Sequence, residues 1–178
     1  MRNTPCNVQS VRKALFSVAF IALFNVFAVL SLAGQDGLPN EKAITDALRA
    51  DGGAVFPVGV ANSSLAQYFT GRSFVAPLQK SMVNVTNVTF EPGCINHWHK
   101  HHASCQVLVA VSGKGYYQIW GEEPKELLPG QSVTIPENVK HWHGAQHGHW
   151  FQHLSIMKEG AKTEWLEPVT PADYAKLK

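Results

Sequence analysis

The sequence predicts an all-β domain, an antiparallel sandwich or barrel. Between Met82 and Met157, short runs rich in β-branched and aromatic residues alternate with glycine and proline, and no helical period of comparable strength is present. The expected strands are residues 82–90, 106–111, 116–120, 132–135 and 150–157. Inward and outward side chains alternate along each strand, so a small barrel of this type can enclose one ligand cavity.

The length of 178 residues and the apolar fraction of 45% suit one globular domain with a real core. We expect three segments: a signal peptide at 1–33, an N-terminal arm with a short helix at 34–80, and the β domain at 81–178.

The first 33 residues have the pattern of an export signal. Three basic residues precede an apolar run at 14–32. The two positions that a signal peptidase reads hold small residues, Ser31 and Ala33. The run is close to the length of a membrane span, so an uncleaved anchor is the alternative, and Asn25 within the run favours cleavage. The sequence therefore predicts a protein exported to a bacterial periplasm, with no stable membrane insertion after cleavage.

The charge of the chain outside this signal is close to zero. Removal of Arg2, Arg12 and Lys13 leaves 12 basic residues against 13 acidic ones, a formal charge of −1. A nucleic-acid-binding domain would carry a basic patch, so we expect no nucleic-acid partner.

The arm begins with a candidate helix at 41–50. Asn40 can cap it, Ile44 and Leu48 share one face, and Gly52 and Gly53 end it. Residues 55–77 are expected to be irregular, because prolines and glycines interrupt them.

Two cysteines, Cys94 and Cys105, flank a histidine cluster, and Cys6 leaves with the signal. Export permits a disulfide between them, two buried free thiols are an equal alternative, and metal ligation is a third. The short cysteine spacing of structural zinc sites is absent from the sequence.

The histidines carry the chemical information. All nine lie between His97 and His153, and His99 and His101 are two residues apart, as are His141 and His143. Alternate residues of a strand share one face, and imidazole is a common ligand of divalent transition metals. We therefore expect His99, His101 and His141 to bind one metal ion.

The other histidines are interpreted from their positions along the chain. His143 is expected to share the inward face with His141, as a donor, a substrate contact or a packing group. His97 would share a face with His99 if the strand is regular. We expect three further histidines to be exposed: His102, His147 and His149.

Two spaced motifs resemble those of the cupin superfamily. Gly93, His99, His101, Gln106 and Gly113 follow the spacing of the first motif, with glutamine where many cupins have glutamate. The second motif is matched by Gly130, Pro136 and His141, with Asn138 at a position where glycine is usual. The resemblance implies a double-stranded β-helix, or jelly roll, with one metal held by His99, His101, Gln106 and His141.

A closer resemblance covers residues 66–174. Runs such as YFTGRSFVAPL, PENVKHWHGA and EWLEPVTPADY are similar to the small single-domain cupins associated with carboxymuconolactone decarboxylases, and to manganese-dependent cupin hydroxynitrile lyases. The lyases imply a metal set of three histidines and a glutamine, with a histidine at the place of His153 in proton transfer. This chain departs from them by one additional residue between His101 and Gln106.

The glutamine favours one class of chemistry. A neutral amide in place of a carboxylate leaves the metal its full double positive charge, which strengthens it as a Lewis acid and disfavours a ferric state. The sequence therefore predicts a mononuclear metallocupin that acts on a small molecule by lyase chemistry, with manganese first and iron or zinc as alternatives. His153 and His143 are the expected catalytic residues.

Two other classes stay open: a dioxygenase that uses iron and oxygen, and a non-catalytic cupin that binds a metal or a sugar. A homodimer is the expected assembly.

Overall fold

The structure, a computed structural model, describes residues 40–175 and residue 177. The signal peptide predicted at 1–33 lies outside the described residues. Residues Glu41–Lys178 form one compact unit. Across the described part of the chain, no helix has the length and apolar character of a membrane span.

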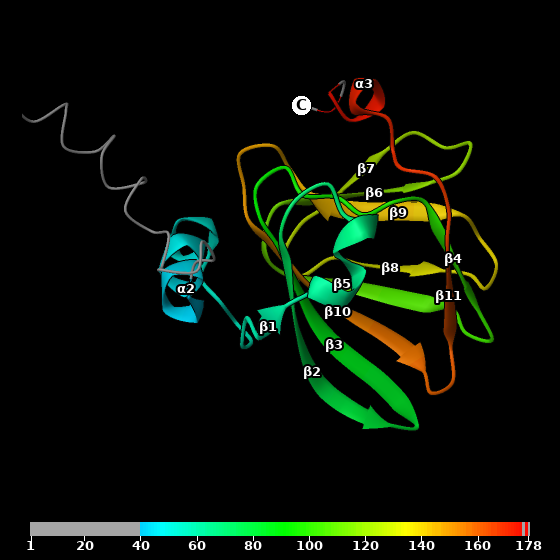
Figure 1. Ribbon diagram of the computed structural model, residues 1–178, viewed down its shortest axis with the longest axis horizontal. Helices are drawn as coiled ribbons and strands as arrows, with labels where there is room; N and C mark the ends of the chain where they lie inside the picture. The colour runs from blue at the N-terminus through cyan, green and yellow to red at the C-terminus, as the bar shows by residue number, and fades with distance from the viewer. Residues whose placement is uncertain (1–39, 176, 178) are drawn as a thin grey trace, which may run out of the picture. The chain divides into compact units, whose positions relative to one another are not determined.

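The described chain forms two antiparallel sheets, as the sequence predicts (Figure 1). One sheet has six strands in the order β1 (Val60–Ala61), β2 (Ser73–Ser81), β3 (Val83–Phe90), β10 (Phe151–Lys158), β5 (Gln106–Gly113) and β8 (Ser132–Ile135). The other has five, in the order β11 (Lys162–Trp165), β4 (His99–His102), β9 (His141–Ala145), β6 (Gly115–Ile119) and β7 (Lys125–Leu127).

The five expected strands are confirmed as β3, β5, β6, β8 and β10, each within two residues at either end. The expectation of irregular structure at 55–77 is wrong in part, because β1, the 3₁₀ helix η2 (Ser63–Tyr68) and the start of β2 lie there. Pro77 suggested a break, yet β1 pairs only with Phe74 and Val75, so Pro77 lies where β2 has a single partner strand and its missing N–H is tolerated. The domain boundary predicted between residues 80 and 81 falls within β2.

The predicted helix is α2 (Glu41–Leu48), followed by the 3₁₀ helix η1 (Arg49–Asp51). Gly52 ends it at φ 98°, the left-handed conformation that glycine adopts without strain. Ile44 and Leu48 are buried against Val58 and Phe74. A second helix, α3 (Pro171–Tyr174), is capped by the hydroxyl of Thr170, which accepts from the Asp173 backbone N–H at 3.1 Å.

One close approach holds the segment before β4 against β9. A Cβ atom on Gly144 would lie 2.5 Å from both the Cys94 carbonyl oxygen and the Ile95 Cα, so only glycine fits there. The contact brings Asn96 next to His143, whose backbone N–H donates to the Asn96 Oδ1 at 3.0 Å.

The two cysteines are free, so the structure does not contain the disulfide that export would permit. Cys94 is buried and Cys105 is exposed, which corrects the alternative of two buried thiols. Burial raises the pKa of the Cys94 thiol to about 12. Cys105 is exposed because it lies in the turn between β4 and β5.

This difference predicts the thiol chemistry of the native protein. In a Cys6→Ser chain, a water-soluble thiol reagent should modify one cysteine quickly, Cys105, and reach Cys94 only on unfolding, because the thiolate is the reactive form. Counting modified thiols before and after addition of denaturant tests this, with Cys105→Ser as the control that should show no fast phase. Fast modification of Cys94 in folded protein would contradict it.

Candidate metal centre

Three histidines from two strands meet inside the barrel. His99 and His101 lie on β4 and His141 lies on β9, and one ring nitrogen from each lies within 4.8 Å of the others. β4 and β9 pair at His99 and His141, which places these two rings 4.1 Å apart between centroids. His101 joins them because it is two residues from His99 on the same strand face. All three side chains are buried.

The Nδ1 atom of each ring has a partner. His99 Nδ1 lies 2.9 Å from the His97 carbonyl oxygen, and His141 Nδ1 lies 2.9 Å from the Val139 carbonyl oxygen. A carbonyl can only accept, so both Nδ1 atoms carry the proton and both Nε2 atoms keep a lone pair. His101 Nδ1 lies 3.1 Å from the Thr163 hydroxyl oxygen. Such partners fix the tautomer and ring orientation of metal-binding histidines.

Gln106 is the fourth predicted ligand, and its carbonyl oxygen is directed at the histidines. Its Nε2 donates to the Ser155 hydroxyl at 2.9 Å, which leaves Oε1 2.9 Å from His141 Nε2. These two atoms are both acceptors, because the proton of His141 is on Nδ1. Rotation of the amide would let Gln106 donate to His141, so the orientation found here is the one that suits a cation.

The donor set fits a divalent transition metal. His101 Nε2 is buried, and no group of the described residues hydrogen-bonds to it. An unpaired buried nitrogen is costly, and so are two lone pairs that face each other at hydrogen-bond distance. Three neutral imidazoles and a carbonyl oxygen are ligands that manganese, iron and zinc accept. His99, His101, His141 and Gln106 are therefore the residues that could hold the ion.

Burial keeps these histidines neutral. Desolvation is the largest cause in each case: it lowers the pKa of His101, holds the pKa of His99 well below 6.5, and lowers the pKa of His141 to about 4. The neighbouring histidines lower the pKa of His99 further. Neutral imidazole is the form that binds a metal, so the site is ready for the ion at neutral pH.

Two more buried histidines continue from this cluster. The His143 ring lies 5.3 Å from the His99 ring and 4.8 Å from the His153 ring. His153 is fully buried between Phe90 and Phe151, and neither of its ring nitrogens has a hydrogen-bond partner among the described residues. Burial lowers the pKa of His153 to about 4 and holds that of His143 well below 6.5. His143 thus lies next to the three-histidine cluster, and His153 lies behind His143.

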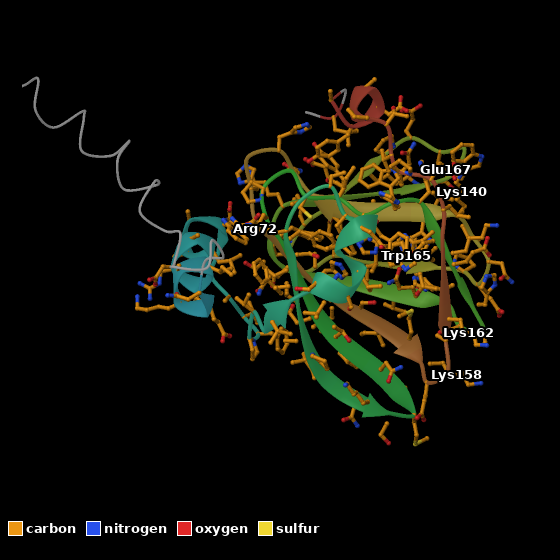
Figure 2. All side chains as sticks on the ribbon, in the orientation of Figure 1. Arg72, Lys140, Lys158, Lys162, Trp165 and Glu167 are labelled. Atoms are coloured by element: carbon orange, nitrogen blue, oxygen red, sulfur yellow. The ribbon has the colours of Figure 1, made fainter. Side chains whose placement is uncertain are left out.

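An aromatic wall lies on the other side of His99. Trp165, labelled in Figure 2, lies on β11. It is opposite His99 in the strand pairing, and the two rings are 4.9 Å apart. Tyr68 stacks on Trp165 at 4.7 Å with 7° between the planes, and Phe69 lies 5.9 Å from Trp165. Apolar walls beside a few polar groups are typical of small-molecule sites.

The remaining histidines lie outside the three-histidine cluster. His97 donates its backbone N–H to the Tyr68 carbonyl oxygen, and its own carbonyl holds His99. His147 is exposed, as expected, and stacks on Tyr174. The His102 side chain keeps 42% of its surface exposed, in line with the expectation, whereas His149 is partly buried, which corrects the expectation for that residue. His102 contacts Asn138 and Glu164, and His149 contacts Asp51, which explains its burial.

Two of the departures from the motif pattern, Asn138 and the additional residue before Gln106, are accommodated by left-handed residues. Asn138, at the usual glycine position, has φ 65°, a conformation that asparagine tolerates, so the turn is kept. Ala103, in the longer connection between His101 and Gln106, has φ 64°, and its backbone N–H donates to Glu137 Oε1 at 2.7 Å. The connection therefore still delivers Gln106 to the histidines.

Several supporting residues were not found from the sequence. Thr163 and Trp165 reach the site only because β11 pairs with β4, and Asn96 reaches it because its loop crosses β9. No local motif marks these contacts. Ser155 could have been found from the sequence, because it lies two residues from His153 and therefore on the same strand face.

The buried histidines predict a loss of stability in mild acid. Above about pH 6.5 they are neutral in both the folded and unfolded states; below it the unfolded chain binds protons that the folded chain, with lowered pKa values, does not. The free energy of unfolding should therefore fall between about pH 6.5 and 4, by about 1.4 kcal/mol per pH unit for each histidine. Urea unfolding of metal-free protein at several pH values measures this. An unchanged midpoint across that range would contradict it.

Thr163 should hold His101 in its metal-binding orientation. Thr163→Val removes the hydroxyl partner with little change in shape and should weaken manganese binding about tenfold or more. Thr163→Ser keeps the hydroxyl and should bind almost as well as the original chain. Competition with a chromophoric chelator measures both affinities. Equal affinities for the valine and serine variants would exclude this role.

Comparison with known proteins agrees with this geometry. Residues 86–151 match the family model described as a cupin domain. The (R)-mandelonitrile lyase of Granulicella tundricola is 35% identical over 117 residues, which are 62% of this chain and 88% of the relative.

Solved structures agree as well. A cupin-like protein from Thermotoga maritima is 37% identical, with a TM-score of 0.64 over 69% of this chain and 96% of that protein. A Klebsiella pneumoniae protein with a double-stranded β-helix domain shares the fold at 16% identity, with a TM-score of 0.50 over 55% of this chain and 87% of that one. The two sheets, the three-histidine cluster and these relatives agree: the chain belongs to the cupin family, as a small cupin.

Proposed function

We propose that this protein is a metal-dependent lyase that cleaves a small cyanohydrin or a closely related hydroxylated molecule. The observation that carries the proposal is the buried row of rings from the His99, His101 and His141 cluster through His143 to His153. The His143 ring is then the one ring between the candidate metal site and His153, the candidate proton acceptor. The likeness to a mandelonitrile lyase supports the same reaction class.

His99, His101, His141 and Gln106 would hold one divalent ion, and we propose manganese. The bound ion would supply Lewis acidity toward a substrate hydroxyl or carbonyl oxygen. The protein adds no carboxylate to this set, so it does not neutralise the positive charge. The backbone partners of His99 and His141 and the hydroxyl of Thr163 keep the ring nitrogens in position.

His153 is the proposed proton carrier. In cyanohydrin cleavage the hydroxyl proton leaves as the bond between the carbinol carbon and the nitrile carbon breaks, the carbinol becomes an aldehyde, and cyanide takes up one proton. His153 is neutral and both its ring nitrogens lack partners in the described chain, so it can accept the first proton and return it to cyanide. His143 lies between His153 and the cluster, and would contact the reacting oxygen or the leaving group.

The aromatic wall favours a substrate with a ring. Tyr68, Phe69 and Trp165 present aromatic surface next to His99, against which a phenyl group could pack. Phe90 and Phe151 pack on His153, and Trp165 packs on His99. The shape of this wall is the feature that would select among cyanohydrins.

Export and dimer formation are further proposals. Export to a periplasm is supported by the sequence of residues 1–33, and a homodimer by the resemblance to other small cupins.

The reaction is tested by following mandelonitrile cleavage, as release of benzaldehyde, with protein loaded with manganese. We expect turnover, and we expect His153→Ala to lower kcat/KM by about 100-fold or more while the manganese content is unchanged. His147→Ala changes an exposed histidine outside the cluster and is the matched control, with activity like the original chain.

Three outcomes would oppose the proposal. An inert, fully loaded protein would exclude mandelonitrile, and full activity in His153→Ala would exclude the proton-transfer role. Oxygen uptake with an iron-loaded protein would instead support dioxygenase chemistry.

A further inference from the structure

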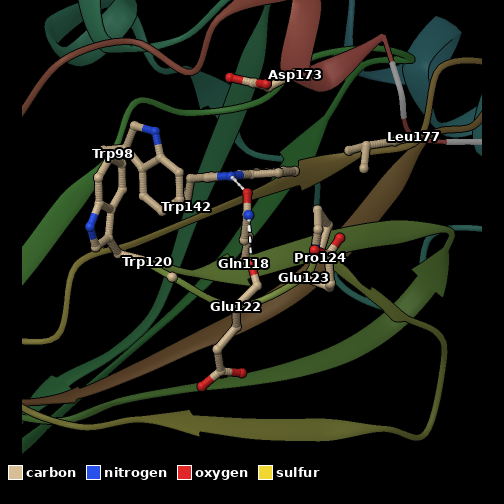
Figure 3. A pocket seen from close by; sticks show the side chains of 10 residues that line it. Trp98, Gln118, Trp120, Glu122, Glu123, Pro124, Trp142, Asp173 and Leu177 are labelled. Carbon is tan, nitrogen blue, oxygen red and sulfur yellow. Dashed lines mark hydrogen bonds between the residues drawn. The ribbon is translucent and has the colours of Figure 1, made fainter.

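A cavity lies on the face of the five-stranded sheet that is turned away from the metal centre. Trp142 stands between His141 and His143 on β9, and side chains alternate along a strand, so it projects away from the metal centre. The cavity there has a volume of about 670 Å³, and its lining includes Trp98, Trp120, Trp142, Glu122, Glu123 and Asp173 (Figure 3). No histidine of the metal centre lines it. We call this cavity the tryptophan groove.

Aromatic rings form one wall of the tryptophan groove. Trp98 lies between the other two, with its ring 5.0 Å from Trp120 and 6.4 Å from Trp142, edge to face in both pairs. Trp98 and Trp142 are buried, whereas Trp120 is 58% exposed. An exposed tryptophan of this kind offers its ring to a ligand, since tryptophan is the strongest cation–π partner.

The protein already places a cation on this wall. The Lys140 ammonium lies 3.4 Å from the centre of the Trp120 ring and 5.2 Å from that of Trp98. The same ammonium is paired with Glu167 (Figure 2). The negative π surface is therefore suited to positive charge.

The charged residues of the lining are all acidic: Glu122, Glu123 and Asp173. Lys125, 2.7 Å from Glu122, neutralises part of this charge from outside the groove. Gln118 also lines the groove, and both polar atoms of its side chain are hydrogen-bonded. Its Oε1 accepts from the Trp142 indole N–H and its Nε2 donates to the Glu122 carbonyl, each at 2.7 Å. The described residues of the lining thus offer acceptors and π surfaces, and the nearby Lys140 ammonium is already paired with Glu167. A sugar, which needs donors as well as acceptors, suits it less well than a cation.

We propose that the tryptophan groove binds a small organic cation, a protonated amine with an apolar body. The ammonium group would lie near Glu123 and Asp173, and the apolar body would pack on the exposed Trp120 ring and on Leu177. The volume is in the range of small-molecule sites. Because the backbone of β4 and β9 separates this groove from the histidines, the site is independent of the proposed lyase function.

Phenethylammonium is the probe, with 2-phenylethanol as its neutral analogue of similar shape. We expect saturable quenching of tryptophan fluorescence by the amine, confirmed by calorimetry, and binding at least about tenfold weaker for the alcohol. Trp120→Ala, a change at an exposed position, should weaken amine binding about tenfold, and Glu123→Gln about threefold. Glu41→Gln removes a carboxylate on α2 and should have no effect. Higher salt should weaken binding of the amine but not binding of the alcohol.

Five results would overturn the proposal. Equal binding of the alcohol, or unchanged amine binding in folded Trp120→Ala, would exclude the cation site. Binding of methyl glucoside without binding of the amine would show a sugar site instead. Loss of amine binding on addition of manganese or mandelonitrile would place the amine at the metal centre. Loss of binding as protein concentration rises would show that a second copy of the chain covers the groove. If the protein has no lyase activity but still binds the amine, the proposed function is rejected and the amine site is retained.

Discussion

The pairing of β4 with β9 at His99 and His141 is the contact on which the site depends. It joins two strands that are distant in sequence, and the alternation along each strand then places His101 and His143 on the same inner face. The other edge of β4 pairs with β11, which adds Thr163 and Trp165. A one-residue shift in this register would turn the ligands of one strand to the opposite face of the sheet, so the register decides whether the site exists.

Burial inside the barrel destabilises the folded protein when no ion is bound, and it favours a bound cation. Five buried histidines, His99, His101, His141, His143 and His153, are held neutral by desolvation, and several of their polar atoms face no partner in the described chain. A bound metal would stabilise the folded state, since it binds the folded chain better than the unfolded one. Because Gln106 is neutral, the ion would keep its charge for the substrate. Removal of these groups from water thus explains both the lower stability of the metal-free protein and the proposed Lewis acidity of the bound ion.

β9 also shows how one strand serves two environments. Its histidines face the barrel and Trp142 faces the tryptophan groove, because successive side chains point to opposite sides. The inner face is neutral and rich in lone pairs, whereas the outer cavity is aromatic and acidic. Trp98, the residue before β4, lines the tryptophan groove, whereas its neighbour His99 belongs to the three-histidine cluster. The sheet keeps the two chemistries apart at the distance of a single backbone layer.

The amino-acid sequence by itself determined the all-β class, the five main strands and the alternate-residue histidines, because local periodicity and motif spacing carry that information. It also identified Gln106 and His153 as candidates through the family resemblance. The tertiary structure alone decided which strands pair, and with them the roles of Thr163, Trp165 and Asn96, which lie far from the motifs in sequence. It also decided that Cys94 and Cys105 are free, and that Asn138 and Ala103 take left-handed conformations that keep the turns. These features depend on contacts between distant segments and on backbone angles, and neither is visible in spacing along the chain.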